Sequence, residues 1–171
     1  MEYKDLVQER YSCKSYDPDK EIEEDKLRYI LNCGRLAPTA KNLQEQHIYV
    51  ARSKEALQKV DQITPCRYGA PVVLIIAFDS SSVFTYPGGK RDSGIEDAAI
   101  VATHMMLAAK DCGIDSCMIN KLDPDEAACI LSLPANEKIL MLMDLGYASA
   151  SAKPLPNHTS RKGLADTVSC I

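Results

Sequence analysis

The sequence VVLIIAF occupies residues 72–78, near the middle of a chain of 171 residues. Seven consecutive apolar residues, most of them β-branched, are typical of a strand buried on both faces of a sheet. Two further short runs, HIYVA at residues 47–51 and KILMLMDL at residues 138–145, have the same character. All three segments are therefore predicted to be buried strands.

The longest predicted helix follows the central run and covers residues 93–112. Gly113 stands directly after it and suits a left-handed C-cap. Apolar residues nearly encircle this helix, a pattern that indicates burial on every side. We expect it either to pack in the core under the sheet or to lie in a dimer interface.

Helical spacing and cap signals outline the remaining elements. A short helix is predicted over residues 3–9, a second runs from Glu23 until Pro38 stops it, and a third lies between the first two strands. A strand over residues 115–120 precedes a short helix, which Asp123 could start with Pro124 at its first position.

Helices and strands alternate, but two helices at the front and an irregular tail do not make a regular doubly wound pattern. The predicted fold class is therefore α+β. No linker or repeat divides the chain, so residues 1–171 are expected to be one domain.

Composition excludes several classes of function. The net charge of −4 and the pI near 5.4 argue against nucleic-acid binding, which normally uses a basic stripe. No segment resembles a secretory signal or a membrane span, so a cytoplasmic protein is expected. Seven cysteines without a CxxC pair indicate reduced thiols, and three scattered histidines predict no metal site.

Arg10, Ser12 and Lys14 stand at alternate positions, so an extended backbone would point all three the same way. Two cations and a hydroxyl on one face could bind an anion such as phosphate. A solvated charged strand would show the same pattern.

Two other polar segments could take part in binding. APTAKNLQ at residues 37–44 carries Thr39, Asn42 and Gln44, which could hydrogen-bond a polyhydroxyl chain or a heterocycle, or could simply end a helix. KPLPNHTSRK at residues 153–162 is a proline-interrupted, strand-like segment that ends in cations, or else a disordered or packing arm. YPGG at residues 86–89 indicates a turn.

Taken in order, these pieces resemble the FMN-dependent nitroreductase family over most of the chain. The matching motifs are RYSCKSY (10–16), APTAKNLQ (37–44), APVVLI (70–75), DSG (92–94), GIDSCMI (113–119), LGY (145–147) and SRK (160–162). The chain departs from the family at Glu45 and Gln46, where many relatives have Pro-Trp, and at Asn120, where glycine is common. The short connection 79–92 lacks the inserted helices of larger relatives and suggests an open flavin face.

The resemblance implies an intertwined homodimer with FMN in two clefts at the interface and the tail 150–171 reaching the partner subunit. Arg10 and Ser12 would face the phosphate and ribityl chain, Lys14 the pyrimidine edge, and the backbone N–H of Asn120 the flavin N5. The implied cofactor-binding set is Arg10, Ser12, Lys14, Pro38, Thr39, Ala40, Asn42, Gln44, Asn120, Arg161 and Lys162, with residues 38–44 coming from the other subunit.

The chemistry implied by the resemblance is that of the cofactor, and no catalytic side chain is expected. NADH or NADPH would deliver hydride to flavin N5, and a nitroaromatic compound, a quinone or a second flavin would accept it. Two alternatives remain within the resemblance. One is a specialised flavin enzyme such as a dehalogenase or an FMN-consuming protein, and the other is a non-catalytic flavin-binding redox sensor or carrier.

Overall fold

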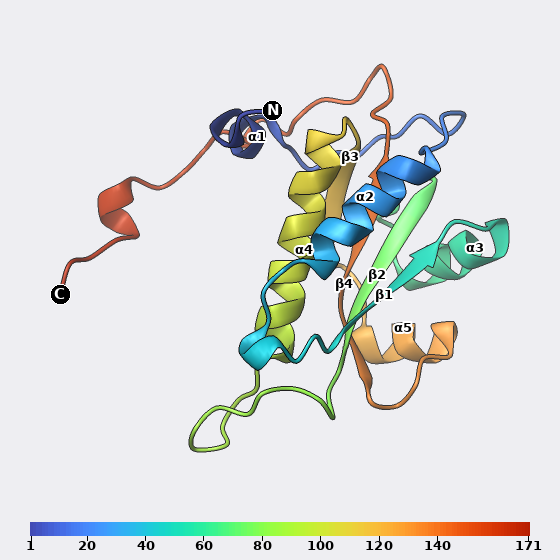
Figure 1. Ribbon diagram of the computed structural model, residues 1–171. Coiled ribbons are helices and arrows are strands. Elements are labelled where there is room, and N and C mark those ends of the chain that lie inside the picture. Colours follow the sequence, from blue (N-terminus) through green and yellow to red (C-terminus); the bar gives the residue numbers. More distant parts are fainter.

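Four strands form one antiparallel sheet in the order β1–β2–β4–β3 in the computed structural model, which describes residues 1–171 (Figure 1). β2 lies at the centre and pairs with β1 on one side and with β4 on the other. The strand bounds are β1 (Gln46–Ala51), β2 (Val72–Asp79), β3 (Asp115–Ile119) and β4 (Glu137–Gly146).

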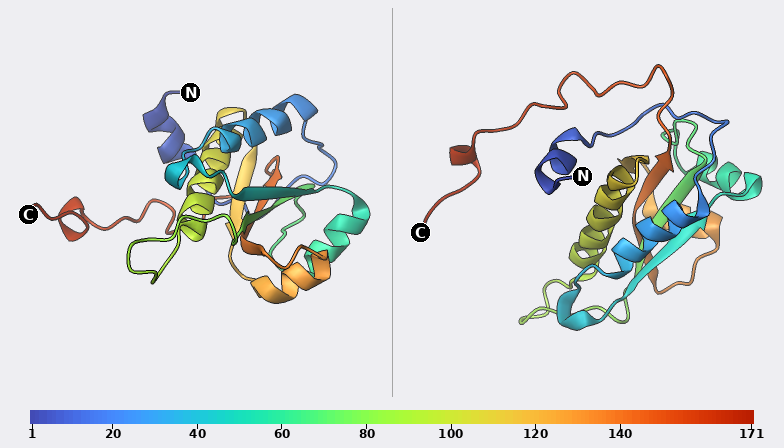
Figure 2. Two further views of the ribbon diagram at one scale, coloured as in Figure 1. Left: turned by 60° about the horizontal axis from the view of Figure 1, so that its bottom comes forward. Right: turned by 45° about the horizontal axis from the view of Figure 1, so that its top comes forward.

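Helices cover both faces of this sheet, which confirms the α+β prediction (Figure 2). α2 and α4 pack on one face, and α3 and α5 pack on the other. The helix bounds are α1 (Tyr3–Glu9), α2 (Glu24–Arg35), α3 (Lys54–Ile63), α4 (Gly94–Asp111) and α5 (Pro124–Leu131), with short 3-10 turns at Ala40–Asn42 and Leu164–Asp166. None of these helices combines the length and apolar character needed to cross a membrane.

Local sequence signals account for the ends of these helices. Gly113 follows α4 with φ of +78°, a conformation that costs glycine little. Asp123 starts α5, because its side chain accepts hydrogen bonds from the backbone N–H groups of Asp125 and Glu126. Both caps agree with the sequence predictions.

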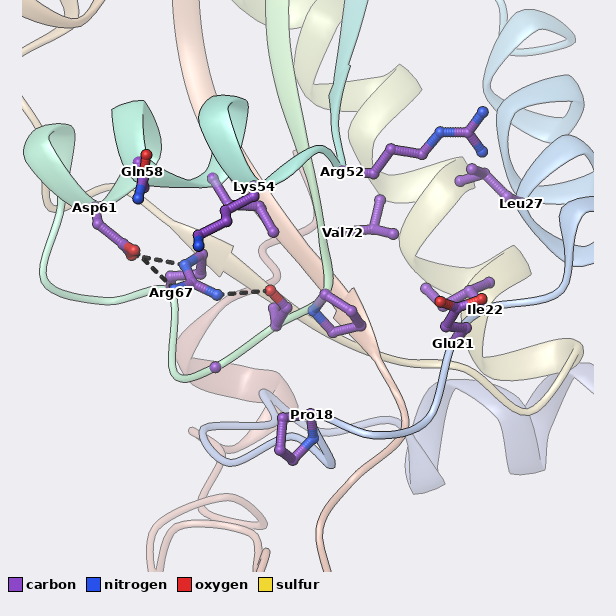
Figure 3. A pocket seen from close by; sticks show the side chains of 14 residues that line it. Pro18, Glu21, Ile22, Leu27, Arg52, Lys54, Gln58, Asp61, Arg67 and Val72 are labelled. Carbon is purple, nitrogen blue, oxygen red and sulfur yellow. Dashed lines mark hydrogen bonds and ion pairs between the residues drawn. The ribbon is translucent and has the colours of Figure 1, made fainter.

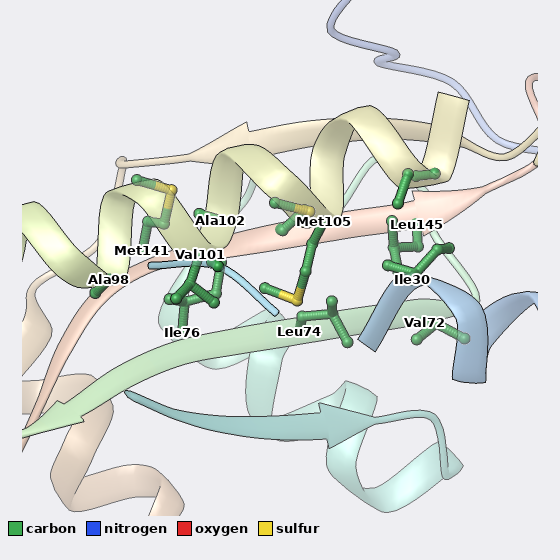
Figure 4. Packing of buried hydrophobic residues seen from close by; sticks show 14 of the residues in the cluster. Ile30, Val72, Leu74, Ile76, Ala98, Val101, Ala102, Met105, Met141 and Leu145 are labelled. Atoms are coloured by element: carbon green, nitrogen blue, oxygen red, sulfur yellow. The ribbon is translucent and has the colours of Figure 1, made fainter. Parts of the chain in front are cut away.

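The larger hydrophobic cluster lies between the sheet and helices α2 and α4 (Figure 4). Ile30 from α2, Leu74 from β2 and Met105 from α4 are fully buried in it. Full burial of one such side chain stabilises the fold by ~1.5–3 kcal/mol. Gly34 lets the two helices approach closely, because a Cβ there would come within 2.6 Å of Met105 Cγ.

Three sequence predictions need correction. β1 is only partly buried, because it is an edge strand with a single neighbour in the sheet. Within one chain α4 is not buried on every side, since only one of its faces packs against the sheet and the side chains of Ile95 and Ile100 are 62% and 39% exposed, which leaves the alternative of a dimer interface. The segment 153–162 contains no strand, which leaves the alternative of an arm, and the tail 150–171 extends away from the body of the chain (Figure 2).

Candidate functional site

The segment 10–16 is extended, pairs with β3 at residues 12–13, and bridges Ala148 beyond β4 at Tyr16. The backbone N–H of Cys13 donates to the carbonyl oxygen of Ser116 at 3.0 Å, and Ser12 forms a parallel bridge with the same residue. Cys13 is fully buried, whereas Ser12 and Lys14 are exposed and Arg10 is partly exposed. The alternation predicted from the sequence is therefore present, and it directs Ser12 and Lys14 outward.

Lys14 lies beside residues that the sequence analysis did not select. Its Nζ is 5.8 Å from the centre of the Tyr68 ring. A hydrogen bond from the Tyr68 hydroxyl lowers the pKa of the Cys66 thiol, with smaller contributions from the charges of Lys121 and Lys14. Lys121 directly follows Asn120, which is exposed just beyond β3. Because Asn120 was an expected site residue, the sequence could have indicated Lys121 as a neighbour of the site.

The cations of this region have no acidic partner within the chain. None of the ion pairs in the structure includes Arg10, Lys14 or Lys121. Cations without a carboxylate partner can bind an external anion without first breaking an internal ion pair. This edge of β3 therefore has the chemistry of an anion-binding surface.

The turn at residues 38–44 adopts an unusual backbone. Lys41, Asn42 and Gln44 have φ values of 53°, 56° and 57°, in the left-handed region that non-glycine residues rarely occupy. Two hydrogen bonds hold the turn: Ala40 N–H donates to Asp97 Oδ1 at 3.0 Å, and Gln44 N–H donates to Thr39 Oγ1 at 3.0 Å. The side chains of Pro38, Asn42 and Gln44 are left exposed to a possible ligand.

The turn and the segment 10–16 lie at opposite ends of α4 (Figure 1). The turn is bonded to Asp97 in the first turn of this helix, while the segment pairs with β3, which begins after the helix ends. A helix of 18 residues is roughly 27 Å long. One chain therefore does not bring these two groups of expected cofactor residues to one flavin.

The first part of the tail passes close to the segment 10–16. The rings of Tyr11 and His158 meet edge to face, with their centres 6.3 Å apart. Arg161 donates through Nη1 to the carbonyl oxygens of His158 at 2.6 Å and Ser160 at 2.7 Å. Arg161 and Lys162 are exposed and form no ion pair. Apart from the contact of His158 with Tyr11, no contact places these two cations at the edge of β3 within one chain.

A cavity of about 580 Å³ lies elsewhere, between the segment leading into α2, helix α3 and the loop before β2 (Figure 3). Arg67 lines it and is fully engaged, donating twice to Asp61 at 2.6 and 2.7 Å and once to the Ala70 carbonyl at 3.0 Å. No expected cofactor residue lines this cavity. The expected cofactor residues therefore lie outside this cavity.

A carboxyl group is buried in the core behind the segment 10–16. Asp144 on β4 is fully buried, and neither of its oxygens has a hydrogen-bond partner. Its neighbours across the sheet are Val73 and Cys117, and the buried hydroxyl of Tyr16 also lacks a partner. Burial raises the pKa of Asp144 to about 8, although the charge of Arg67 opposes the change. The carboxyl is therefore mostly protonated at neutral pH.

Known proteins share both the sequence and the fold. The model of the nitroreductase family matches residues 7–66 and 63–147. A nitroreductase family protein from Clostridium difficile is 32% identical, and its crystal structure superposes with a TM-score of 0.91 over 99% of this chain and 98% of that one. A protein from Exiguobacterium sibiricum, solved in complex with FMN, has the same fold at 18% identity, with a TM-score of 0.87 over 100% and 98% of the two chains.

A relative from Helicobacter pylori strain J99 is named oxygen-insensitive NADPH nitroreductase. It is 24% identical over an alignment of 203 positions, which covers 97% of this chain and 95% of that protein. The matched family model covers most of the chain, including the segment along β3, the turn at residues 38–44 and all four strands. This chain therefore belongs to the nitroreductase family.

Proposed function

We propose that this chain is an NAD(P)H oxidoreductase that works as a homodimer with FMN bound between the subunits. The observation that carries the proposal is the group of unpaired cations beside β3, on a segment that presents Ser12 and Lys14 outward. The Clostridium difficile structure and the named NADPH nitroreductase relative support it, since both share most of their length with this chain.

The residues present fit the chemistry of FMN. A phosphate binds cations and hydroxyl donors, which Arg10 and Ser12 offer on the segment 10–16, and Arg161 of the tail is proposed to supply a further cation. Lys14 would lie toward the pyrimidine end of the ring, where a positive charge favours electron uptake. When bound, FMN supplies hydride transfer at N5 between a reduced nicotinamide and an oxidised acceptor. Asn120 follows β3 directly, at a place where its backbone N–H could face that ring.

A dimer would bring together the turn at residues 38–44 and the segment 10–16, which lie apart in one chain. The turn with Thr39 and Asn42 at one end of α4 would meet the cations of the partner, and the partner's turn would meet the cations of this chain. The apolar face that α4 leaves exposed, with Ile95 62% exposed, supports an interface there. The tail, with Leu164 77% exposed, is proposed to wrap around the partner subunit.

The acceptor is proposed to be a nitroaromatic compound, a quinone or a second flavin. The connection between β2 and α4 is short and carries only a turn at Tyr86, where Gly89 N–H donates to its carbonyl oxygen at 2.9 Å. With no helix inserted there, the flavin would be open to acceptors of different shapes.

The absorption spectrum of the purified protein tests this proposal. We expect a flavin spectrum, either as purified or after addition of FMN, and bleaching of that spectrum in anaerobic stopped-flow mixing with NADH or NADPH. A colourless protein that takes up no FMN would overturn the proposal. A flavin that neither nicotinamide reduces would instead favour a flavin-binding sensor or carrier. Light scattering coupled to size exclusion should give the mass of two chains.

A further inference from the structure

Two buried carboxyl groups, those of Glu45 and Asp97, lie beneath the turn at residues 38–44, and both residues hydrogen-bond to Ser93. Glu45 and Asp97 are 5% and 4% exposed. Glu45 Oε1 accepts a hydrogen bond from Ser93 Oγ at 3.3 Å, and Asp97 Oδ1 accepts one from Ala40 N–H at 3.0 Å. The second oxygen of each carboxyl, Glu45 Oε2 and Asp97 Oδ2, is buried without any partner.

No positive charge neutralises this pair. Lys41 of the turn places its Nζ 4.7 Å from the centre of the Phe84 ring, and Arg91 pairs with Glu96 at 3.5 Å. The other titratable groups of the neighbouring elements are engaged elsewhere: Asp79 accepts from Ser81 and Asn136, Asp92 caps α4 through Gly94 N–H, and Tyr86 donates to Glu96.

Two buried carboxylates side by side cannot both be ionised, because each would lose its hydration and repel the other. A single shared proton would remove one charge and allow a charge-assisted hydrogen bond between the two carboxyl groups. Burial and the hydrogen bond to Asp97 both raise the pKa of Glu45, in agreement with this arrangement.

We propose that Glu45 is a positioning residue, and that it shares one proton with Asp97 to hold the turn at residues 38–44 against the start of α4. The proposal deepens the proposed function and rests on it, because the turn matters for the reaction only as a wall of the flavin cleft. The turn needs such a restraint, since three of its residues hold left-handed backbone conformations. Ala40 N–H is bonded to Asp97 itself, so the orientation of that carboxyl decides the position of the turn.

The direction of the pH effect follows from the raised pKa. The shared proton stabilises the turn at low pH, and this stabilisation is lost as pH rises through the raised pKa of Glu45 in the folded protein. Two adjacent negative charges then replace one hydrogen bond. Glu45→Gln should remove this sensitivity, because its amide N–H can donate to Asp97 at every pH.

Hydrogen exchange of the turn tests the pairing without any measurement of activity. The backbone protection of residues 38–44 should fall about ten- to a hundredfold with rising pH in the wild type, the equivalent of one charge-assisted hydrogen bond, after correction for intrinsic exchange. Glu45→Gln should keep its protection across the same range. Glu96→Gln, a control on the same helix, should behave as the wild type does. Equal pH profiles for the wild type and Glu45→Gln would overturn the proposal.

A second measurement covers the case in which Glu45→Gln does not fold. Carbon-13 NMR of glutamate-labelled wild-type protein should show one buried carboxyl that titrates well above the ordinary glutamate range, and its absence would also refute the shared proton. FMN affinity, followed by flavin fluorescence against pH, separates the two proposals. The hydrogen exchange of the turn could depend on pH while FMN affinity does not. That result would support the shared proton, but it would exclude the turn from the flavin cleft and so overturn the positioning role of Glu45.

Discussion

Asp144→Asn should change how the stability of the protein depends on pH. The carboxyl is fully buried without a hydrogen-bond partner, and its pKa rises from an ordinary 3.8 to about 8. A folded-state pKa above the unfolded value means that stability is greatest at low pH and is lost as pH rises to about 8. The loss is ~1.4 kcal/mol for each pH unit within that window.

Between pH 5 and pH 8, the wild type should therefore lose roughly 3–4 kcal/mol of unfolding free energy relative to Asp144→Asn. An asparagine has nearly the same shape but does not titrate, so the variant isolates the proton from the packing. Its buried amide also lacks partners, which costs ~1–3 kcal/mol at every pH and does not alter the slope.

Urea unfolding at pH 5, 6, 7 and 8 measures this difference, with protein concentration held constant because the stability of the proposed dimer would depend on it. Asp125→Asn is the matched control, since it removes an exposed carboxylate from α5 and should leave the pH slope of the wild type in place. Parallel stability curves for the wild type and Asp144→Asn would refute the reasoning and would mean that Asp144 is ionised or has a polar partner in solution.

Three further outcomes are expected. Arg10→Ala should weaken FMN binding about ten- to a hundredfold, because it removes a charge-assisted contact, and an unchanged dissociation constant in a flavin titration would exclude Arg10 from the site. Asp123→Ala should lower the free energy of unfolding by ~1 kcal/mol through loss of the α5 cap. Gly94→Ala should cost ~1–3 kcal/mol, since a Cβ there would collide with the Phe78 ring. The exposed Thr103→Ala is the control for both urea measurements and should stay within ~0.5 kcal/mol of the wild type.

Much of the candidate site could be predicted because its signals are local. The alternation of Arg10, Ser12 and Lys14 depends only on an extended backbone, and the segment is extended beside β3. The polar turn after α2 could be predicted because Pro38 stops the helix and a strand begins a few residues later. The roles of these residues toward FMN came from the family resemblance and remain predictions, since neither spacing nor charge identifies a particular ligand.

Other parts of the site could not be predicted, because they depend on residues that meet only in the folded chain. Nothing near Lys14 in the sequence indicates that Tyr68 and Cys66 lie beside it. Glu45 looked like a departure from the family pattern, and only the packing of α4 against the turn puts Asp97 next to it.

The sequence by itself determined the local elements. Its apolar runs predict β2 and β4, Gly113 ends α4, Asp123 starts α5, and its net charge argues against a basic nucleic-acid surface. These features depend on neighbours within a few residues, so periodicity and caps are enough to predict them.

Only the tertiary structure decided how much of each element is buried and which polar groups meet. It put β1 at the edge of the sheet, left one face of α4 exposed, and buried Asp144 without a partner. It also placed the turn at residues 38–44 and the segment 10–16 at opposite ends of α4. The physical reason is that strand order and helix packing join residues far apart in the chain, and no local pattern encodes those contacts.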